Sequence, residues 1–81
     1  MPTTDEITQK IIEIAASVAN LPKVTVTTQS NFVDDLGFDS LDAQEFTMHV
    51  EKEFGVSIAD EQREEMPTVQ HFVDFVVAHQ S

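Results

Sequence analysis

The residue with the clearest chemical potential is Ser40, in the sequence DDLGFDSLDAQEF (residues 34–46), where four aspartates and one glutamate surround it. A nucleophilic serine needs a general base and an oxyanion hole. The hydrolase pattern G-x-S-x-G is absent, because the residues here read Gly-Phe-Asp-Ser-Leu. His49 lies about two and a half helical turns from Ser40, too far to act as its base. Only a catalytic triad with His71 or His79 stays open. The sequence therefore predicts that the chain is not an enzyme.

A phosphate held only by noncovalent contacts is also disfavoured at Ser40. The backbone amides at the start of a helix suit an anion, but no lysine or arginine lies between Lys23 and Lys52. A phosphate joined through a covalent bond has no such requirement, because the bond and not the affinity holds it. We therefore expect Ser40 to be modified by another enzyme.

The aspartates around Ser40 do not form a recognisable metal site. The EF-hand pattern is absent from residues 34–37. Glu45 and His49 are four residues apart and could share an ion, but two ligands make a weak site. No specific metal ion is expected.

Four helices must position this segment, and no strand is expected. Thr3 and Glu6 have the spacing of a capping box, and Asp39 is a suitable N-cap for the helix that ends at Gly55. The expected helices cover residues 4–19, 40–54 and 60–65, with a fourth that opens at Thr68 and carries an apolar stripe over residues 69–77. The predicted fold is all-α: a small four-helix bundle of three main helices and one short one.

A long loop, residues 22–39, joins the first two helices. Its Val-Thr alternation has no second strand to pair with, so a loop is the better interpretation. Phe32, Val33 and Leu36 are expected to anchor it. Gly37 is expected to adopt a backbone conformation that other residues resist.

Length and charge limit the kind of protein. The 81 residues are enough for one domain over residues 1–81. The formal net charge of −11 disfavours nucleic acid and anionic membranes and favours partners with basic surfaces. There is no cysteine, no apolar run long enough to span a membrane and no visible targeting segment, so a cytoplasmic monomer is expected.

The second expected helix has two apolar sides. Ala43, Phe46, Val50 and Phe54 fall between roughly 140° and 220° from Leu41 on a helical wheel and form the core face. Leu41 and Met48 fall on the opposite side, among carboxylates. Scattered surface apolar residues are common, but this pair with an acidic rim predicts a docking surface.

The segment DLGFDSLD resembles the D-L-G-x-D-S-L-D attachment motif of the acyl carrier proteins. The resemblance continues through Glu45–Phe46, VEKEFGVSI and MPTVQHFVDFV, and so covers essentially the whole chain. It implies a carrier that holds acyl intermediates as thioesters and delivers them to enzymes of fatty-acid synthesis or of related lipid or polyketide synthesis. It also implies that a phosphopantetheinyl transferase joins 4′-phosphopantetheine from coenzyme A to Ser40.

The resemblance implies two further groups of residues. The surface that meets acyl-transferring and synthase enzymes with basic docking surfaces would consist of Asp39, Leu41, Asp42, Glu45, Met48 and Glu51. The pocket that shelters the acyl chain would be lined by Phe46, Val50, Ile58 and Val69, each equally explained as plain core.

Several residues depart from the pattern usual in fatty-acid carriers, namely Phe38, Gln44, Thr47, His49 and Lys52. They leave the attachment chemistry intact and put the pathway and the cargo in question. Two alternatives stay open. One is a peptidyl or aminoacyl carrier, which the aspartate before the serine disfavours. The other is an acidic helical adaptor whose serine is only a cap or a kinase site.

Overall fold

The computed structural model describes residues 3–79, and within them every regular element is a helix. The elements are α1 (Thr4–Ala19), the short 3-10 helix η1 (Lys23–Thr25), α2 (Ser40–Phe54), α3 (Asp60–Glu64) and α4 (Val69–His79). The only extended pairing among these residues is one isolated bridge between Asn31 and Thr68. The predicted all-α bundle of three main helices and one short helix is confirmed.

The start and end of α1 follow from local side-chain chemistry. The Glu6 amide donates to Thr3 Oγ1 over 3.2 Å, and the Thr3 amide donates to Glu6 Oε1 over 3.0 Å, which forms the predicted capping box. Ile7, Ile11 and Ala15 are buried along one stripe. The helix ends at Asn20, whose φ of 59° is left-handed.

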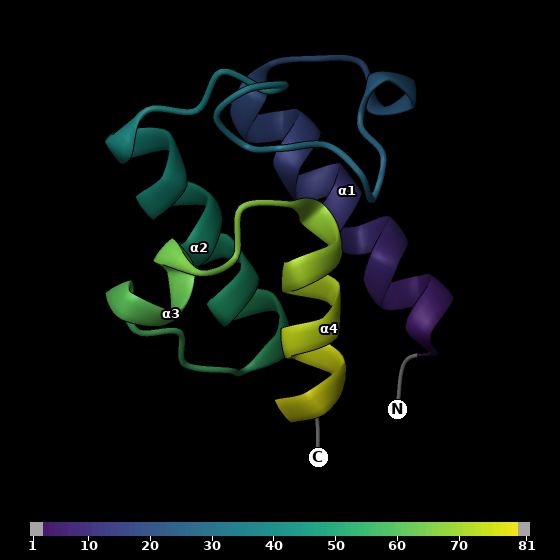
Figure 1. The fold of residues 1–81 in the computed structure, drawn as a ribbon. Helices are drawn as coiled ribbons and strands as arrows, with labels where there is room; N and C mark the ends of the chain where they lie inside the picture. Colours follow the sequence, from purple (N-terminus) through teal and green to yellow (C-terminus); the bar gives the residue numbers. More distant parts are fainter. Residues whose placement is uncertain (1–2, 80–81) are drawn as a thin grey trace.

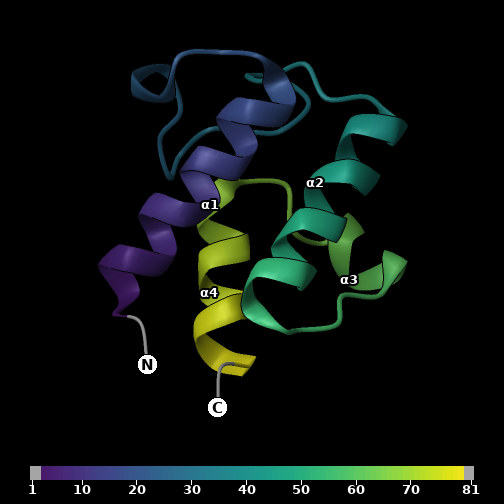
Figure 2. The same ribbon diagram turned by 180° about the vertical axis from the view of Figure 1, so that it is seen from behind.

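The helices pack around one apolar core. α4 lies between α1 and α2 in both views of the ribbon (Figures 1 and 2), and α1 contacts both of the other long helices. Four residues of the α4 stripe are buried. Val77 is 42% exposed, because it lies at the edge of the stripe. The buried four are Val69, Phe72, Val73 and Val76.

The long connection between α1 and α2 is tied to the start of α4. The Phe32 amide donates to the Pro67 carbonyl over 3.0 Å, and the Val69 amide donates to the Ser30 carbonyl over 3.1 Å. Phe32 and Leu36 are buried as expected, but the expectation for Val33 is wrong, because its side chain is 67% exposed. Val33 lies in a turn between the buried Phe32 and the exposed Asp34. The helical turn η1 was also not expected.

The connection crosses the end of the bundle at which α1 ends and α2 begins, so it delivers the chain to Ser40 (Figure 1). Within residues 3–79, no helix is both long enough and apolar enough to cross a membrane.

Candidate functional site

The segment before Ser40 is held by its own hydrogen bonds. Asn31 Oδ1 accepts from the amides of Val33 and Asp34, each over 2.9 Å. Asp35 Oδ2 in turn accepts from the Asn31 amide over 2.7 Å. An asparagine that bonds the backbone two and three residues ahead fixes a turn without help from a sheet or helix. The loop therefore reaches Ser40 in a defined conformation.

Two buried rings and a glycine set the direction in which the chain enters α2. Phe38 is only 5% exposed, and its amide donates to the Phe32 carbonyl over 2.8 Å. Gly37 has a φ of 70°, the left-handed conformation that the sequence predicts there. The chain turns at Gly37, buries Phe38, and leaves the next two side chains in solvent.

Ser40 is the first residue of α2, directly after the N-cap Asp39. The Asp42 amide donates to Asp39 Oδ1 over 2.8 Å, and the Asp39 amide donates to Asp42 Oδ2 over 3.3 Å. This capping box satisfies two of the amides at the helix start and leaves those of Ser40 and Leu41 without a partner among residues 3–79. Two free amides and the positive end of the helix dipole suit a phosphodiester joined to Ser40.

The surroundings of Ser40 do not suit catalysis. Its side chain is exposed, and within the described part of the chain no hydrogen bond engages its hydroxyl. His49 lies nine residues further along α2, which is about 13 Å of helix. No cluster of three or more potential metal ligands occurs among residues 3–79. His71 Nδ1 is hydrogen-bonded to Thr68 Oγ1 and His79 Nδ1 to the Phe75 carbonyl, so among the described residues no hydrogen bond joins a histidine to Ser40.

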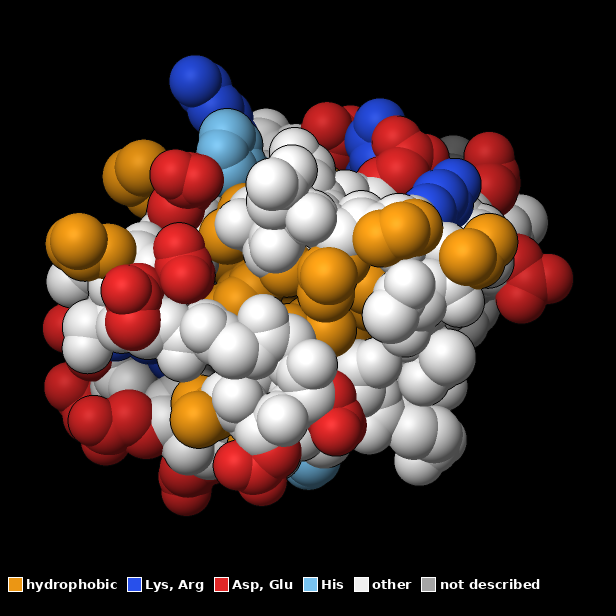
Figure 3. Space-filling view, turned by 90° about the horizontal axis from the view of Figure 1, so that it is seen from above, with side chains coloured by type: hydrophobic (Ala, Val, Ile, Leu, Met, Phe, Trp, Pro, Cys, Tyr) orange, Lys and Arg blue, Asp and Glu red, His pale blue; other side chains and the backbone are white. Residues whose placement is uncertain are grey.

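The outer face of α2 combines apolar and acidic side chains. Leu41 is 74% exposed and Met48 is 62% exposed, which confirms that both stand in solvent. Asp39 and Glu45 are exposed beside them, and Asp42 is half-buried. In the space-filling view, hydrophobic and acidic side chains lie together at the left edge of the molecule, where the start of α2 is seen from above (Figure 3). We call Asp39, Leu41, Asp42, Glu45 and Met48 the α2 face.

Glu51 differs from the rest of the predicted docking set. Its Oε2 accepts a hydrogen bond from the Ile58 amide over 2.7 Å, and the pair is partly buried. The carboxylate thereby holds the segment after α2 against the helix. A carboxylate engaged in this way is less available to a partner's cation, so we assign Glu51 a structural role and leave it out of the α2 face.

A cavity of about 220 Å³ lies between α2, the loop before it (residues 31–38), α3 and the start of α4. Of the four residues expected to line an acyl pocket, Phe46 lines this cavity. Val50 and Val69 are fully buried, and Ile58 is 8% exposed in the core. These three side chains belong to the hydrophobic core and do not line this cavity.

Thr47 and Arg63 also line the cavity, and neither was predicted to do so. Thr47 is only 6% exposed, and its hydroxyl donates to the Ala43 carbonyl over 2.7 Å. The signal for Thr47 was available, because it falls one position from the core face of the helical wheel. Arg63 belongs to the short helix α3, whose orientation no periodicity could define.

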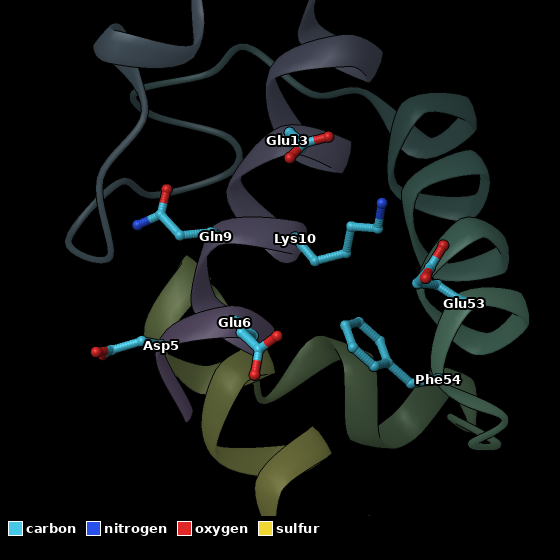
Figure 4. A pocket seen from close by; sticks show the side chains of 7 residues that line it. All are labelled: Asp5, Glu6, Gln9, Lys10, Glu13, Glu53 and Phe54. Atoms are coloured by element: carbon cyan, nitrogen blue, oxygen red, sulfur yellow. The ribbon is translucent and has the colours of Figure 1, made fainter. Parts of the chain in front are cut away.

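A larger hollow, about 580 Å³, lies at the other end of α2 between α1 and residues 53–54. Figure 4 shows Lys10 reaching across it from α1, with Glu6 and Phe54 below. Its opening is wide and its lining is mainly acidic. Phe54 is about 20 Å of helix away from Ser40, so this hollow is separate from the site at Ser40.

Comparisons with known proteins agree with this geometry. The family model described as "Phosphopantetheine attachment site" matches residues 9–76. The acyl carrier proteins of Rickettsia typhi and Rickettsia canadensis are each 41% identical to the chain over 81 residues, which is 100% of the chain and 94% of the relative. A solved structure of the acyl carrier protein from Enterococcus faecalis is 37% identical, with a TM-score of 0.81 over 98% of this chain and 100% of that one.

Proposed function

Because the chain belongs to the acyl carrier proteins and has their phosphopantetheine attachment domain, we propose that Ser40 is the residue that carries the 4′-phosphopantetheine group. When bound, that group supplies a thiol that holds acyl chains as thioesters. The protein is therefore a carrier and not a catalyst. The names of the relatives favour acyl cargo, as in fatty-acid or related synthesis, over aminoacyl cargo.

The single observation that carries the proposal is the placement of Ser40. Its hydroxyl is exposed at the first residue of α2, directly after a loop held by Asn31 and Asp35, and no hydrogen bond joins it to another group among the described residues. An acceptor for another enzyme needs this accessibility and needs no chemistry of its own. The free amides of Ser40 and Leu41 would face the charged phosphodiester, while the acidic neighbours would discourage free phosphate.

The test is to incubate the protein with coenzyme A and a broad-specificity phosphopantetheinyl transferase and to weigh it intact. We expect one phosphopantetheine mass on the wild type and none on Ser40→Ala. Ser57→Ala is the matched control, since Ser57 is also exposed but lies outside any helix. An equal gain on Ser40→Ala would overturn the assignment of Ser40.

We propose further that the α2 face is the surface on which transferases and synthases dock. Carriers of this family interact with such enzymes, and the charge of −11 favours partners with basic surfaces. Leu41 and Met48 would enter an apolar hollow of the partner, and Asp39, Asp42 and Glu45 would meet its cations. One acyl carrier domain over residues 1–81, acting as a monomer, completes the proposal.

Charge reversal tests the docking proposal. Glu45→Lys should lower the second-order rate of phosphopantetheine transfer severalfold and flatten its dependence on salt, because it removes electrostatic attraction at the contact. Glu53→Lys makes the same charge change at an exposed position of α2 outside the α2 face and should leave the salt dependence nearly unchanged. Equal effects of the two variants would show that only net charge matters and would contradict a defined docking surface.

A further inference from the structure

The 220 Å³ cavity lies beside the proposed attachment residue. Phe38, two residues before Ser40, and Ala43, three residues after it, both line the cavity. The full lining is Asn31, Phe32, Val33, Phe38, Ala43, Phe46, Thr47, Arg63, Glu64, Met66, Pro67 and Phe72. A chain tethered at Ser40 would therefore meet this cavity first, whereas the larger hollow lies at the far end of α2.

Four phenylalanine rings form the wall of the cavity. Phe46 lies at the centre, with its ring centroid 4.8 Å from that of Phe32, 4.8 Å from that of Phe72 and 5.8 Å from that of Phe38. The planes of Phe46 and Phe72 meet at 73°, and those of Phe32 and Phe72 at 85°. Rings at these distances and angles pack edge to face. The four rings thus form one aromatic cluster that borders the cavity.

The core beside the cavity is closely packed. Phe46 and Phe72 are each 1% exposed, and Val50, Val69 and Val73 are at most 1% exposed. An engineered cavity of about 150 Å³ accommodates benzene, so this cavity of 220 Å³ has room for one phenyl ring and roughly two or three further carbons. A long straight chain would have to displace a ring of the wall.

One charged group of the lining, Arg63, also favours an aromatic guest. The Thr47 hydroxyl already donates to Ala43, so its proton needs no partner on the cargo. The Arg63 side chain is only 22% exposed, and its Nη2 forms an ion pair with Asp60 Oδ1 over 3.6 Å. A guanidinium at the rim of a cavity is attracted to the face of an aromatic ring and gains no such attraction from an alkyl chain.

We propose that this carrier shelters a short acyl chain that ends in an aromatic ring, with the ring packed against Phe38, Phe46 and Phe72 beneath Arg63. The inference rests on the proposed attachment at Ser40, because the tether brings the chain to the cavity. It goes further by naming the class of cargo: aryl-terminated acyl groups of about nine carbons, in preference to straight chains.

The test uses two acyl groups of equal carbon number. The transferase loads the protein from the coenzyme A thioesters of 3-phenylpropionate and nonanoate, and of hexadecanoate as a long chain, and intact mass verifies each product. The rate at which hydroxylamine cleaves each thioester then measures shelter. We expect the phenylpropionyl protein to react about two- to tenfold more slowly than the nonanoyl protein, the size of an aromatic pair interaction.

Two variants test the residues. Arg63→Gln and Phe38→Leu should each bring the cleavage rates of the phenylpropionyl and nonanoyl proteins closer together. Lys52→Gln removes a cation outside the cavity and should leave the ratio of these two rates unchanged. Arg63 is not part of the core, so its variant is informative even where Phe38→Leu is unstable. Loaded proteins that react at equal rates, or a hexadecanoyl protein that reacts slowest, would overturn this inference alone. Absence of any mass gain would overturn the attachment at Ser40 and the inference with it.

Discussion

Removal of the Glu51 carboxylate should destabilise the fold. Its Oε2 accepts from the Ile58 amide over 2.7 Å in a partly buried position. Glu51→Ala takes the acceptor away and leaves that amide without a partner, while Ile58 itself is 8% exposed. The segment between α2 and α3 would then lose its attachment to α2.

The size of the effect follows from the contact. Hydrogen bonds to a charged group contribute about 1.5–3 kcal/mol, and a buried donor left unsatisfied costs about 1–3 kcal/mol. We expect Glu51→Ala to lower the free energy of unfolding by about 2 kcal/mol. For a domain of this size that corresponds to roughly 8–16 °C in Tm. Glu51→Gln keeps an oxygen in place and should lose only about half as much.

The measurement is urea unfolding followed by circular dichroism, with Glu53→Ala as the control. Glu53 is exposed, lies on the same helix and carries the same charge. Both variants remove one negative charge from the chain and from the C-terminal half of α2, so their difference isolates the bond to Ile58. If Glu51→Ala were no less stable than Glu53→Ala, the structural role assigned to Glu51 would be refuted.

Three further outcomes can be checked by the same unfolding assay. Asp39→Ala removes the N-cap of α2 and should lower the free energy of unfolding by about 1 kcal/mol. Gln44→Ala, at an exposed position of the same helix, should leave it almost unchanged. Gly37→Ala should lower the free energy of unfolding by roughly 1–2 kcal/mol, because alanine disfavours the φ of 70° at this position. This cost comes from the backbone alone, since a Cβ there would meet no atom within 4 Å. The hydrogen bonds from the Thr3 amide and hydroxyl hold the pKa of Glu6 below its ordinary value of 4.5. Glu6 therefore stabilises the fold above that value, and the stability gap between wild type and Glu6→Gln should close as pH falls through the folded pKa; a gap that widens in acid would contradict this sign.

The limits of the long helices were predictable because their signals are local. Thr3 with Glu6, Asp39 with Asp42, and Gly55 define helix ends through contacts within four residues. The exposure of Leu41 and Met48 followed from the helical period, which places them opposite Phe46 and Val50. For α1 and α2 the predicted and observed bounds agree.

What the sequence did not reveal depends on contacts between distant segments. Glu51 looks like one more surface carboxylate until the chain returns to bring the Ile58 amide to it. Val33 looks like a loop anchor, but the turn fixed by Asn31 directs it outward. The cavity wall joins Phe32, Phe46 and Phe72 from three separate segments, so only the fold reveals that these rings meet.

The central claim, that Ser40 carries the prosthetic group, is tested most directly by fragmenting the protein purified from its own cells in a mass spectrometer. The account predicts one phosphopantetheine mass on the peptide that contains Ser40, and fragment ions that place it on this residue. An unmodified Ser40 beside the same mass on another residue, such as Ser57, would contradict the account.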